Sequence, residues 1–490
     1  MENIRLKLKS KKLLLRLMAF GIMFIITSCE DNILVEDPKD VVAENYYKTD
    51  SEIKAAVNAI YSPLRRATFI GSYIVILDTH TDWGYGRGSR GQLNEFQGMN
   101  TTNANRVGGV WEMFYESIRN ANLVIQNAQN GNSIDQSKIN KFIAEAKFLR
   151  AFSYFHLVRN WGQVPIRTEN NYQKKNINKS SVDEVYDLII SDLTDAEANL
   201  PEEQSQIGRP TKFAAKTMLA DVYLHLDMFT EARNKANEVI ESNKYSLVPI
   251  DTVDDFYNIF GPEVQTTPEE IFYFKFSRED GQGNYMPWVL NHPSTNLYTY
   301  GGAYAHYSRA TNPFYKKWND EDLRKGLWDM IDFGLGDSTL VSRKFIDPNA
   351  PSAHDAGCDH PIYRYSEVLL IYAEAACRAA GNPTEEAMNA LNQVHRRAYG
   401  EDPNSSSPFD FKVSNYDEAS FIDLIIQERG YEFIFEGKRW FTLKRTNKAQ
   451  EILMKNRGIQ IPEKHYLWPI PTSEINFNDM INDEDQNPGY

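Results

Sequence analysis

Basic residues, cysteines and long apolar runs are all scarce in this chain. Its 490 residues contain 53 Lys and Arg against 67 Asp and Glu, so the formal net charge is −14. An acidic surface is a poor partner for nucleic acid, and we expect none to bind. Three cysteines are too few for a disulfide-rich scaffold. Since 42% of the residues are hydrophobic, the chain can bury a large core.

The common catalytic fingerprints are missing as well. The sequence has no Gly-x-Ser-x-Gly elbow, no His-Glu-x-x-His helix and no dinucleotide fingerprint. The run Gly84-x-Gly86-x-Gly88 lacks the following Lys-Ser/Thr pair of a phosphate-binding loop. We therefore predict that the protein is not an enzyme and uses no cofactor.

Three glutamates deserve a test against that prediction. Glu428, Glu432 and Glu436 are four residues apart, which places them on one face of a helix predicted from Glu428 to Arg445. Paired carboxylates invite a glycosidase hypothesis. Because Arg429 and Arg439 interleave with the row, we interpret it as a structural ion-pair network instead.

A second cluster contains residue types that bind metals, but no second group of such ligands accompanies it in the sequence. His354, Asp355, Cys358, Asp359 and His360 fall within seven residues, whereas zinc sites usually combine two separated ligand pairs. A solvated loop without metal is the better interpretation. A disulfide between Cys358 and Cys377, a cysteine among helical alanines, stays open because nothing in the sequence requires it.

The N-terminus has the pattern of a lipoprotein export signal. Six basic residues precede an apolar run, Leu17–Ile26, that is too short to span a bilayer comfortably, and Ile26-Thr27-Ser28-Cys29 follows. This ending resembles the bacterial lipobox, so residues 1–28 are predicted to be removed and Cys29 lipidated. Removal of six basic residues and Glu2 leaves 47 Lys and Arg, 66 Asp and Glu, and a net charge of −19. Residues 29–40 form an acidic tether, and residues 41–490 a single domain.

Helical periodicity dominates two long parts of the domain. Apolar residues recur at helical spacing in 51–67, 107–130 and 144–161, and alanine-rich helix pairs follow at 210–240 and 365–397. The pairs resemble tetratricopeptide repeats, which bury their faces only by stacking on neighbours. We predict a mainly α fold with helical repeats at 107–243 and 364–398.

Two other regions lose this rhythm and gain aromatic, glycine and amide residues. Residues 71–98 are predicted to be a long loop, and residues 245–352 an irregular face with short helices, packed loops and a strand at Ile271–Phe276. Flat amphipathic rings beside amide and guanidinium groups suit a sugar. The predicted ligand-binding residues are Trp83, Tyr85, Trp288, Tyr298, Tyr300, Tyr304 and Tyr307. Ordinary packing of these aromatics remains an equal alternative.

Five segments, in order, resemble the successive signatures of the SusD/RagB family. They are IRNANLVI (118–125), AEAKFLRAFSYFHLVRNWGQVPI (144–166), RYSEVLLIYAEAACRAAG (364–381), ERGYEFIFEGKRW (428–440), and LWPIPTSEI with the final QNPGY (467–490). One departure is Phe441-Thr442-Leu443, where many relatives carry an Asp-Leu pair after the Arg-Trp.

This resemblance implies a function. Family members are outer-membrane lipoproteins that cap a SusC-like TonB-dependent transporter and help capture oligosaccharides. Glu30 and Asp31 after the cysteine look like the surface-export signal of Bacteroidetes lipoproteins, which implies an outward-facing address. Peptide capture, as in RagB-like members, is the main alternative. A glycoside hydrolase and a helical-repeat scaffold without a small ligand are the others.

Overall fold

The computed structural model describes residues 46–131, 133–296, 302–303, 306–352 and 354–490. Within it, residues 47–490 form one compact unit. The predicted leader, the lipidated Cys29 and the tether 29–40 lie outside the described residues. No helix in the described part of the chain combines the length and the apolar character needed to cross a membrane.

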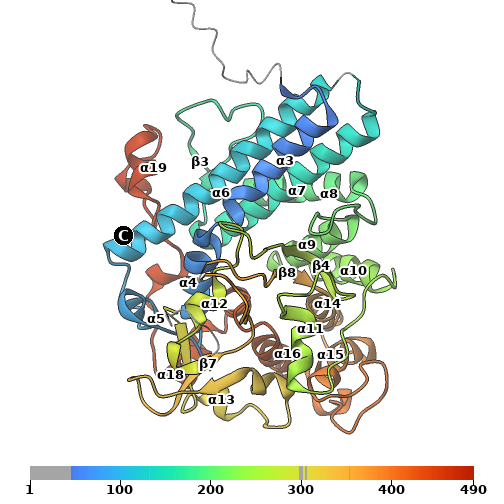
Figure 1. Ribbon diagram of the computed structural model, residues 1–490, viewed down its shortest axis with the longest axis vertical. Coiled ribbons are helices and arrows are strands. Elements are labelled where there is room, and N and C mark those ends of the chain that lie inside the picture. The colour runs from blue at the N-terminus through green and yellow to red at the C-terminus, as the bar shows by residue number, and fades with distance from the viewer. Residues whose placement is uncertain (1–45, 132, 297–301, 304–305, 353) are drawn as a thin grey trace, which may run out of the picture. The chain divides into compact units, whose positions relative to one another are not determined.

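Helices make up most of the described chain (Figure 1). The α-helices are α3 (Asp50–Leu64), α4 (Val75–Thr79), α5 (Gly91–Asn94), α6 (Thr101–Asn127), α7 (Gln136–Trp161), α8 (Val182–Asn199), α9 (Lys212–His225), α10 (Phe229–Ile240), α11 (Tyr257–Phe260), α12 (Met286–Leu290), α13 (Pro313–Lys316), α14 (Tyr365–Ala380), α15 (Glu385–Ala398), α16 (Glu418–Glu432), α17 (Arg439–Arg445), α18 (Ala449–Arg457) and α19 (Thr472–Phe477). The π-helix η2 covers Thr68–Ile74, and the 3₁₀ turns are η3 (Gly88–Arg90), η4 (Ala128–Asn130), η5 (Val253–Phe256), η6 (Pro293–Thr295), η7 (Leu323–Leu327), η8 (Val413–Asn415), η9 (Glu463–Tyr466) and η10 (Asp483–Asp485).

The strands are short. They are β1 (Tyr85–Gly86), β2 (Val164–Pro165), β3 (Lys179–Ser180), β4 (Glu270–Phe274), β5 (His306–Arg309), β6 (Trp328–Met330), β7 (Thr339–Ser342) and β8 (His360–Arg364). A four-stranded antiparallel sheet has the order β1-β5-β7-β6, and β2-β3 and β4-β8 form separate antiparallel pairs. Strand β4 begins one residue before the predicted segment and ends two residues before its end.

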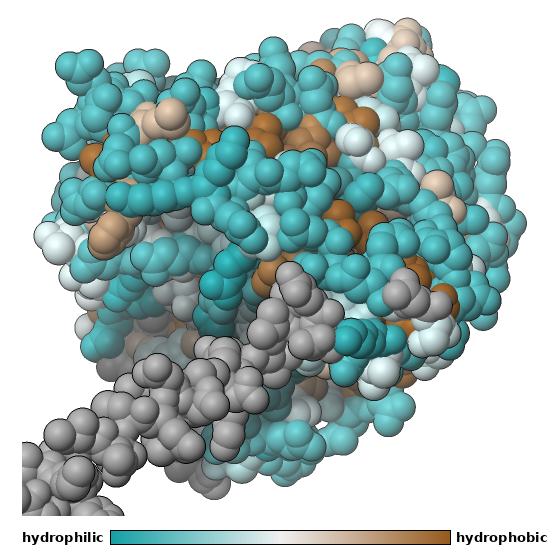
Figure 2. Space-filling view, turned by 90° about the horizontal axis from the view of Figure 1, so that it is seen from above, coloured by the Kyte–Doolittle hydropathy of each residue, from teal (hydrophilic) through white to brown (hydrophobic). Residues whose placement is uncertain are grey.

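The helices pack as a chain of neighbours. Helix α7 contacts α6 and α8, α8 contacts α9, α9 contacts α10, and α10 contacts α14, which in turn packs on α15 and α16 (Figure 1). Each of these helices therefore buries apolar surface mainly against its neighbours in this order, as expected for tetratricopeptide-like pairs. The mainly α prediction is confirmed. The face seen from above Figure 1 is largely hydrophilic, with its apolar residues in small separate groups (Figure 2).

The helix ends follow the local chemistry of the sequence. Gly381 ends α14 in a left-handed conformation with φ of 71°, and the Thr384 side chain accepts a hydrogen bond from the Ala387 amide at the start of α15. Helix α7 ends at Gly162, also at φ of 71°. The cap of α3 is Thr49, which forms a reciprocal capping box with Glu52, so this helix begins one residue before the predicted range 51–67.

The loop predicted for residues 71–98 is wrong in its first third. The π-helix η2 runs directly into α4, so residues 68–79 are helical. This segment is an apolar run whose members, including Phe69, Ile70 and Leu77, are fully buried. Because the segment is buried on most sides, its sequence shows no amphipathic period. The glycines that suggested a loop lie mostly after it, from Gly84 onwards.

The single helix predicted from Glu428 to Arg445 is also wrong. Helix α16 ends at Glu432, and the chain turns through Phe435 and Gly437, both with positive φ, before α17 begins at Arg439. Two buried cations stabilise this break. The Arg364 guanidinium donates to the Glu432 carbonyl at 2.8 Å, and the Lys344 ammonium donates to the Ile434 carbonyl at 2.9 Å. These bonds satisfy carbonyl groups that a continuing helix would have bonded itself.

The C-terminal tail closes on the end of α7. The Trp161 indole packs at 5.0 Å from the Trp468 ring and donates to the Pro469 carbonyl. The Asn487 amide donates to the carbonyls of both tryptophans. This clasp joins two segments that are about 300 residues apart in sequence.

Candidate functional site

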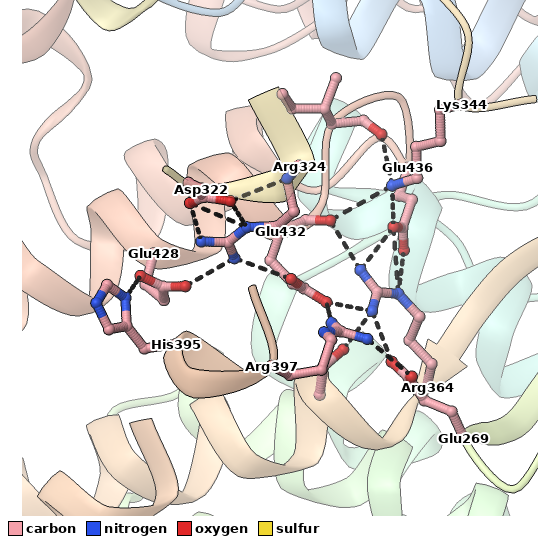
Figure 3. Close-up of polar contacts among 12 residues, drawn as sticks. Glu269, Asp322, Arg324, Lys344, Arg364, His395, Arg397, Glu428, Glu432 and Glu436 are labelled. Atoms are coloured by element: carbon pink, nitrogen blue, oxygen red, sulfur yellow. Dashed lines mark hydrogen bonds and ion pairs between the residues drawn. The ribbon is translucent and has the colours of Figure 1, made fainter. Parts of the chain in front are cut away.

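The glutamate row lies in a buried ion-pair network (Figure 3). Glu432 pairs with Arg364, Arg397 and Arg324, Glu428 pairs with Arg324 at 2.7 Å, and Glu436 pairs with Lys344 at 2.6 Å. Glu269 completes the group by binding both Arg364 and Arg397. The side chains of these residues are at most 4% exposed.

This network is unsuited to acid-base catalysis on a sugar. Burial alone would raise the pKa of Glu428, but Arg324 and His395 outweigh it and hold the pKa at about 2. The pKa of Glu432 is likewise well below its usual value because Arg364 and Arg397 outweigh its burial. A glycosidase acid needs a raised pKa and an open path to the glycosidic bond. The structural interpretation of the glutamate row is therefore supported.

The arginines expected to neutralise that row bind elsewhere. Arg429 pairs with Glu367 at 3.1 Å, and Arg439 pairs with Asp82 at 2.9 Å. The partners of the row come instead from β8, α15 and the segment 322–344. The Arg439–Asp82 pair has a further role because it ties α17 to the loop that carries Tyr85.

Hydrogen bonds from α18 fix the position of the loop 81–86. The Arg457 guanidinium, on α18, donates to the Gly84 carbonyl at 2.8 Å, and the Asn456 amide donates to Asp82 at 2.9 Å. A Cβ on Gly84 would lie 2.0 Å from the Asp78 carbonyl oxygen, so only glycine fits. Helices α17 and α18 thus position this loop as a rigid support.

Tyr85 lies in a compact group that we term the Tyr85 cluster: Tyr85, Tyr307, Arg309 and Arg457. Tyr85 faces Tyr307 across the β1-β5 pair, and their rings stack at 5.5 Å and 22°. The Arg457 guanidinium lies 4.0 Å from the Tyr85 ring centroid and the Arg309 guanidinium 5.3 Å from it. The Arg457 side chain is only 3% exposed. A buried cation therefore packs against the Tyr85 ring of the stacked pair.

A second group, the Tyr285 cluster, consists of the rings of Tyr285, Trp288 and His354, with Arg90 joined to Tyr285 through the Gly71 backbone and Arg106 joined to Arg90 through its neighbour Ser89. The Tyr285 ring lies 4.8 Å from Trp288 and 4.7 Å from His354, and the Trp288 and His354 rings are within 25° of parallel. Tyr285 also packs on Gly71, where a Cβ would lie 2.5 Å from the ring. His354 is exposed and Trp288 half-buried, so this cluster offers aromatic surface to solvent.

Backbone contacts connect the two clusters into one face, the aromatic face. Gly86 of β1 lies against Arg90, to which an added Cβ would approach within 2.6 Å. The Ala303 amide, just before β5, donates to the Trp288 carbonyl at 2.7 Å. Strand β5 links these elements, because it pairs with β1 and β7 and contacts α12 (Figure 1).

The structure separates the predicted ligand residues into three groups. Trp288, Tyr85 and Tyr307 lie on the aromatic face, although Tyr307 is only 7% exposed. Trp83 is 0% exposed and packs edge-on against Phe435 at 5.0 Å. Its burial argues against direct ligand contact. Tyr298, Tyr300 and Tyr304 lie outside the described residues.

Sequence reasoning missed Tyr285, His354 and the arginines of the Tyr285 cluster. Tyr285 is three residues from Trp288, and this spacing on a short helix was a usable signal. His354, Arg90 and Arg106 come from three separate segments. Only the fold brings the His354 ring onto Tyr285 and Trp288 and the two arginines close behind Gly71 and Ser89.

The metal-type cluster 354–360 does not assemble. No group of three metal-type ligands occurs among the described residues. His354 stacks on the aromatic cluster, whereas His360 is buried in β8. Cys358 and Cys377 are both free and buried in the described structure, and the Cys358 thiol donates to the Ile346 carbonyl.

A cleft of about 350 Å³ lies away from the aromatic face, between α3, the loop 206–209 and β4. Its charged groups are largely paired within the protein, since Arg209 binds Glu145 at 2.7 Å and Lys275 binds Asp359 at 2.8 Å. The aromatic face is therefore the better candidate for ligand binding.

Comparison with known proteins places these features in a family. Residues 294–490 match the model of the SusD family, and residues 78–224 match a model described as starch-binding and associating with the outer membrane. The chain belongs to the SusD/RagB family. The matched ranges of this SusD/RagB member contain α17, α18, both stacked tyrosines and the end of α7 at Gly162.

Individual relatives align along nearly the whole chain. The SusD-like protein P2 of Formosa agariphila is 28% identical over 514 residues, which covers 96% of this chain and 98% of the relative. The crystal structure of a SusD homolog from Bacteroides thetaiotaomicron has a TM-score of 0.80 at 22% identity and covers 93% of this chain and 100% of its own. Surface glycan-binding protein A from Bacteroides fluxus has a TM-score of 0.74 at 22% identity and covers 90% and 100%.

Proposed function

We propose that this protein is a cell-surface lipoprotein that binds oligosaccharides and delivers them to a SusC-like TonB-dependent transporter. The observation that carries the proposal is the aromatic face, where stacked rings lie beside guanidinium groups on a rigid support. Such rings stack on the C–H face of a sugar while polar groups bond its hydroxyls. A similar structure bears the name surface glycan-binding protein, which supports the same ligand class.

The test is isothermal titration of the mature protein against a panel of oligosaccharides. A few stacking contacts predict millimolar to high-micromolar dissociation constants, about −4 to −6 kcal/mol. Trp288→Ala is expected to weaken binding about tenfold. Phe477→Ala, which removes a 69% exposed ring on α19, is the control and should change nothing. Equal binding by both variants would remove the aromatic face as the site.

Peptide capture is the outcome that would replace the glycan proposal. A peptide library tested under the same conditions distinguishes the two. Only one of the panels, oligosaccharides or peptides, should contain ligands that bind the wild type and bind Trp288→Ala more weakly. Tyr298, Tyr300 and Tyr304 lie outside the described residues and stay predicted ligand residues, and their alanine variants extend the same titration.

Anchoring and partnership form the second part of the proposal. Residues 1–28 act as the export signal, Cys29 carries the lipid, and residues 29–40 tether the domain to the outer face of the outer membrane. Several acyl chains anchor a protein firmly without a spanning helix. Metabolic labelling with an alkyne fatty acid should mark the wild type and not Cys29→Ala. Affinity purification from membranes should recover a SusC-like transporter, and neighbouring genes should encode it.

A further inference from the structure

Two arginines of the Tyr285 cluster have no acidic partner. The Arg90 guanidinium donates to the Gly71 carbonyl at 2.8 Å, and its Nε is buried with no partner among the described residues. Arg106, on α6, donates to the Ser89 hydroxyl at 2.9 Å and to the Asn103 side chain at 2.7 Å. Neither arginine forms an ion pair with any described carboxylate.

The electrostatic surroundings of these arginines agree with the geometry. Burial, followed by the charge of Arg106, lowers the pKa of Arg90 to about 10. Burial also lowers the pKa of Arg106. Half-buried cations that repel each other raise the free energy of the empty site, and an anion bound between them would lower it.

Such a pair is unexpected in a chain of net charge −14. The long-range field of an acidic protein disfavours anions, but salt screens that field beyond about 8–10 Å. Contacts inside the cluster therefore decide which ligand binds. Arginine is the side chain best suited to bind a planar carboxylate or a sulfate through two parallel hydrogen bonds.

We propose that the Tyr285 cluster recognises a negatively charged sugar residue, with the ring stacked on Trp288 and His354 and its carboxylate or sulfate bound by Arg90 and Arg106. The inference rests on the proposed function and narrows it to anionic oligosaccharides. Uronic acids and sulfate esters share the required chemistry.

The experiment compares matched ligands by isothermal titration at low ionic strength. The probes are a neutral galacto-oligosaccharide, an oligogalacturonate and a sulfated galacto-oligosaccharide of the same length. The wild type is expected to bind at least one anionic probe about tenfold or more tightly than the neutral one, since a charge-assisted hydrogen bond contributes that much. The two anionic arms tell carboxylate from sulfate.

Arginine variants assign the preference to the cluster. Arg106→Gln and Arg90→Gln should each reduce binding of the anionic probe about tenfold more than binding of the neutral probe, so that the ratio of the two affinities falls. Arg106→Lys keeps the charge but loses the planar guanidinium that can form two parallel hydrogen bonds. Its affinity for the anionic probe should lie between those of the wild type and Arg106→Gln. Arg119→Gln is the matched control: Arg119 is exposed, lies on the same helix about 20 Å further along, and has no ion pair in the described structure. Thermal unfolding of every variant confirms that it is folded.

Each result is decisive. If the neutral probe binds as tightly as the anionic ones and Trp288→Ala abolishes both, the glycan function stands and the anionic preference is overturned. If no saccharide binds, both fail. If an acidic hexapeptide binds through Arg106 while no saccharide does, the cluster recognises anions but not sugars, and the inference is again overturned.

Discussion

Arginines occur in two very different settings in this molecule. In the buried network, Arg364 contacts three glutamates and Arg324 contacts two glutamates and an aspartate, and their pKa values rise well above normal because those carboxylates outweigh burial. In the Tyr285 cluster, Arg90 donates to a backbone carbonyl and Arg106 to a hydroxyl and a side-chain amide, neither pairs with a described carboxylate, and their pKa values fall. The compensated cations stabilise the scaffold, whereas the uncompensated ones are available to a ligand.

Removal of one central carboxylate should break the first setting. Glu432→Ala leaves Arg364, Arg397 and Arg324 short of negative charge in the interior. Loss of one partner of a buried ion pair typically destabilises a protein by about 3–5 kcal/mol. Urea denaturation followed by circular dichroism should show this loss, and oligosaccharide affinity of the remaining folded protein should be unchanged. A loss below about 1 kcal/mol would contradict the central role of Glu432.

Two tryptophans sharpen the comparison between support and ligand surface. Trp83→Ala opens a cavity under the sheet and should cost about 3–5 kcal/mol of stability. Trp288→Ala removes a half-buried ring at the surface and should cost about 1 kcal/mol or less while weakening ligand binding. Parallel denaturation and titration of both variants check the assignment. If Trp83→Ala is as stable as the wild type but loses ligand binding, Trp83 contributes to the ligand site and not to the support.

Acid should weaken the network and leave the arginines of the face charged. The pKa of Glu428 is about 2 in the folded protein, because Arg324 and His395 outweigh its burial, against a usual value of 4.5. A lowered pKa contributes stability above pH 4.5, and this contribution disappears as the pH falls towards 2. The difference in unfolding free energy between the wild type and Glu428→Gln should therefore shrink between pH 5 and pH 2. A difference in unfolding free energy that stays constant from pH 5 to pH 2 would contradict a lowered pKa of Glu428.

The smallest effect is expected for an exposed pair that belongs to neither setting. Arg66 binds Glu116 at 2.6 Å, but their side chains are 52% and 32% exposed. A double-mutant cycle with Arg66→Gln and Glu116→Gln should give a coupling of about 0–1 kcal/mol. A larger value would show that burial is not what separates the strong arginine pairs from the weak ones.

Local sequence signals predicted the helical scaffold well. The helix pairs predicted at 210–240 and 365–397 are α9 with α10 and α14 with α15, and their periodicity depends on residues close together in the chain. The segment 68–79 and the break after Glu432 were missed, because their conformations depend on burial and on distant cations. The candidate site was predicted in part: its aromatic composition was visible, but the Tyr285 cluster joins α12 to residues from three other segments.

The sequence by itself determined which faces of the helices are apolar, where the repeat helices end and which family the signatures resemble. These properties depend on spacings of three, four or seven residues. Only the tertiary structure decided which charges are neutralised. Arg364 meets Glu432, Glu269 meets Arg364, and Arg324 meets Glu432 across separations of 68, 95 and 108 residues. Arg90 and Arg106 pair with no described carboxylate, because the packing directs them to the Gly71 carbonyl and to the Ser89 and Asn103 side chains.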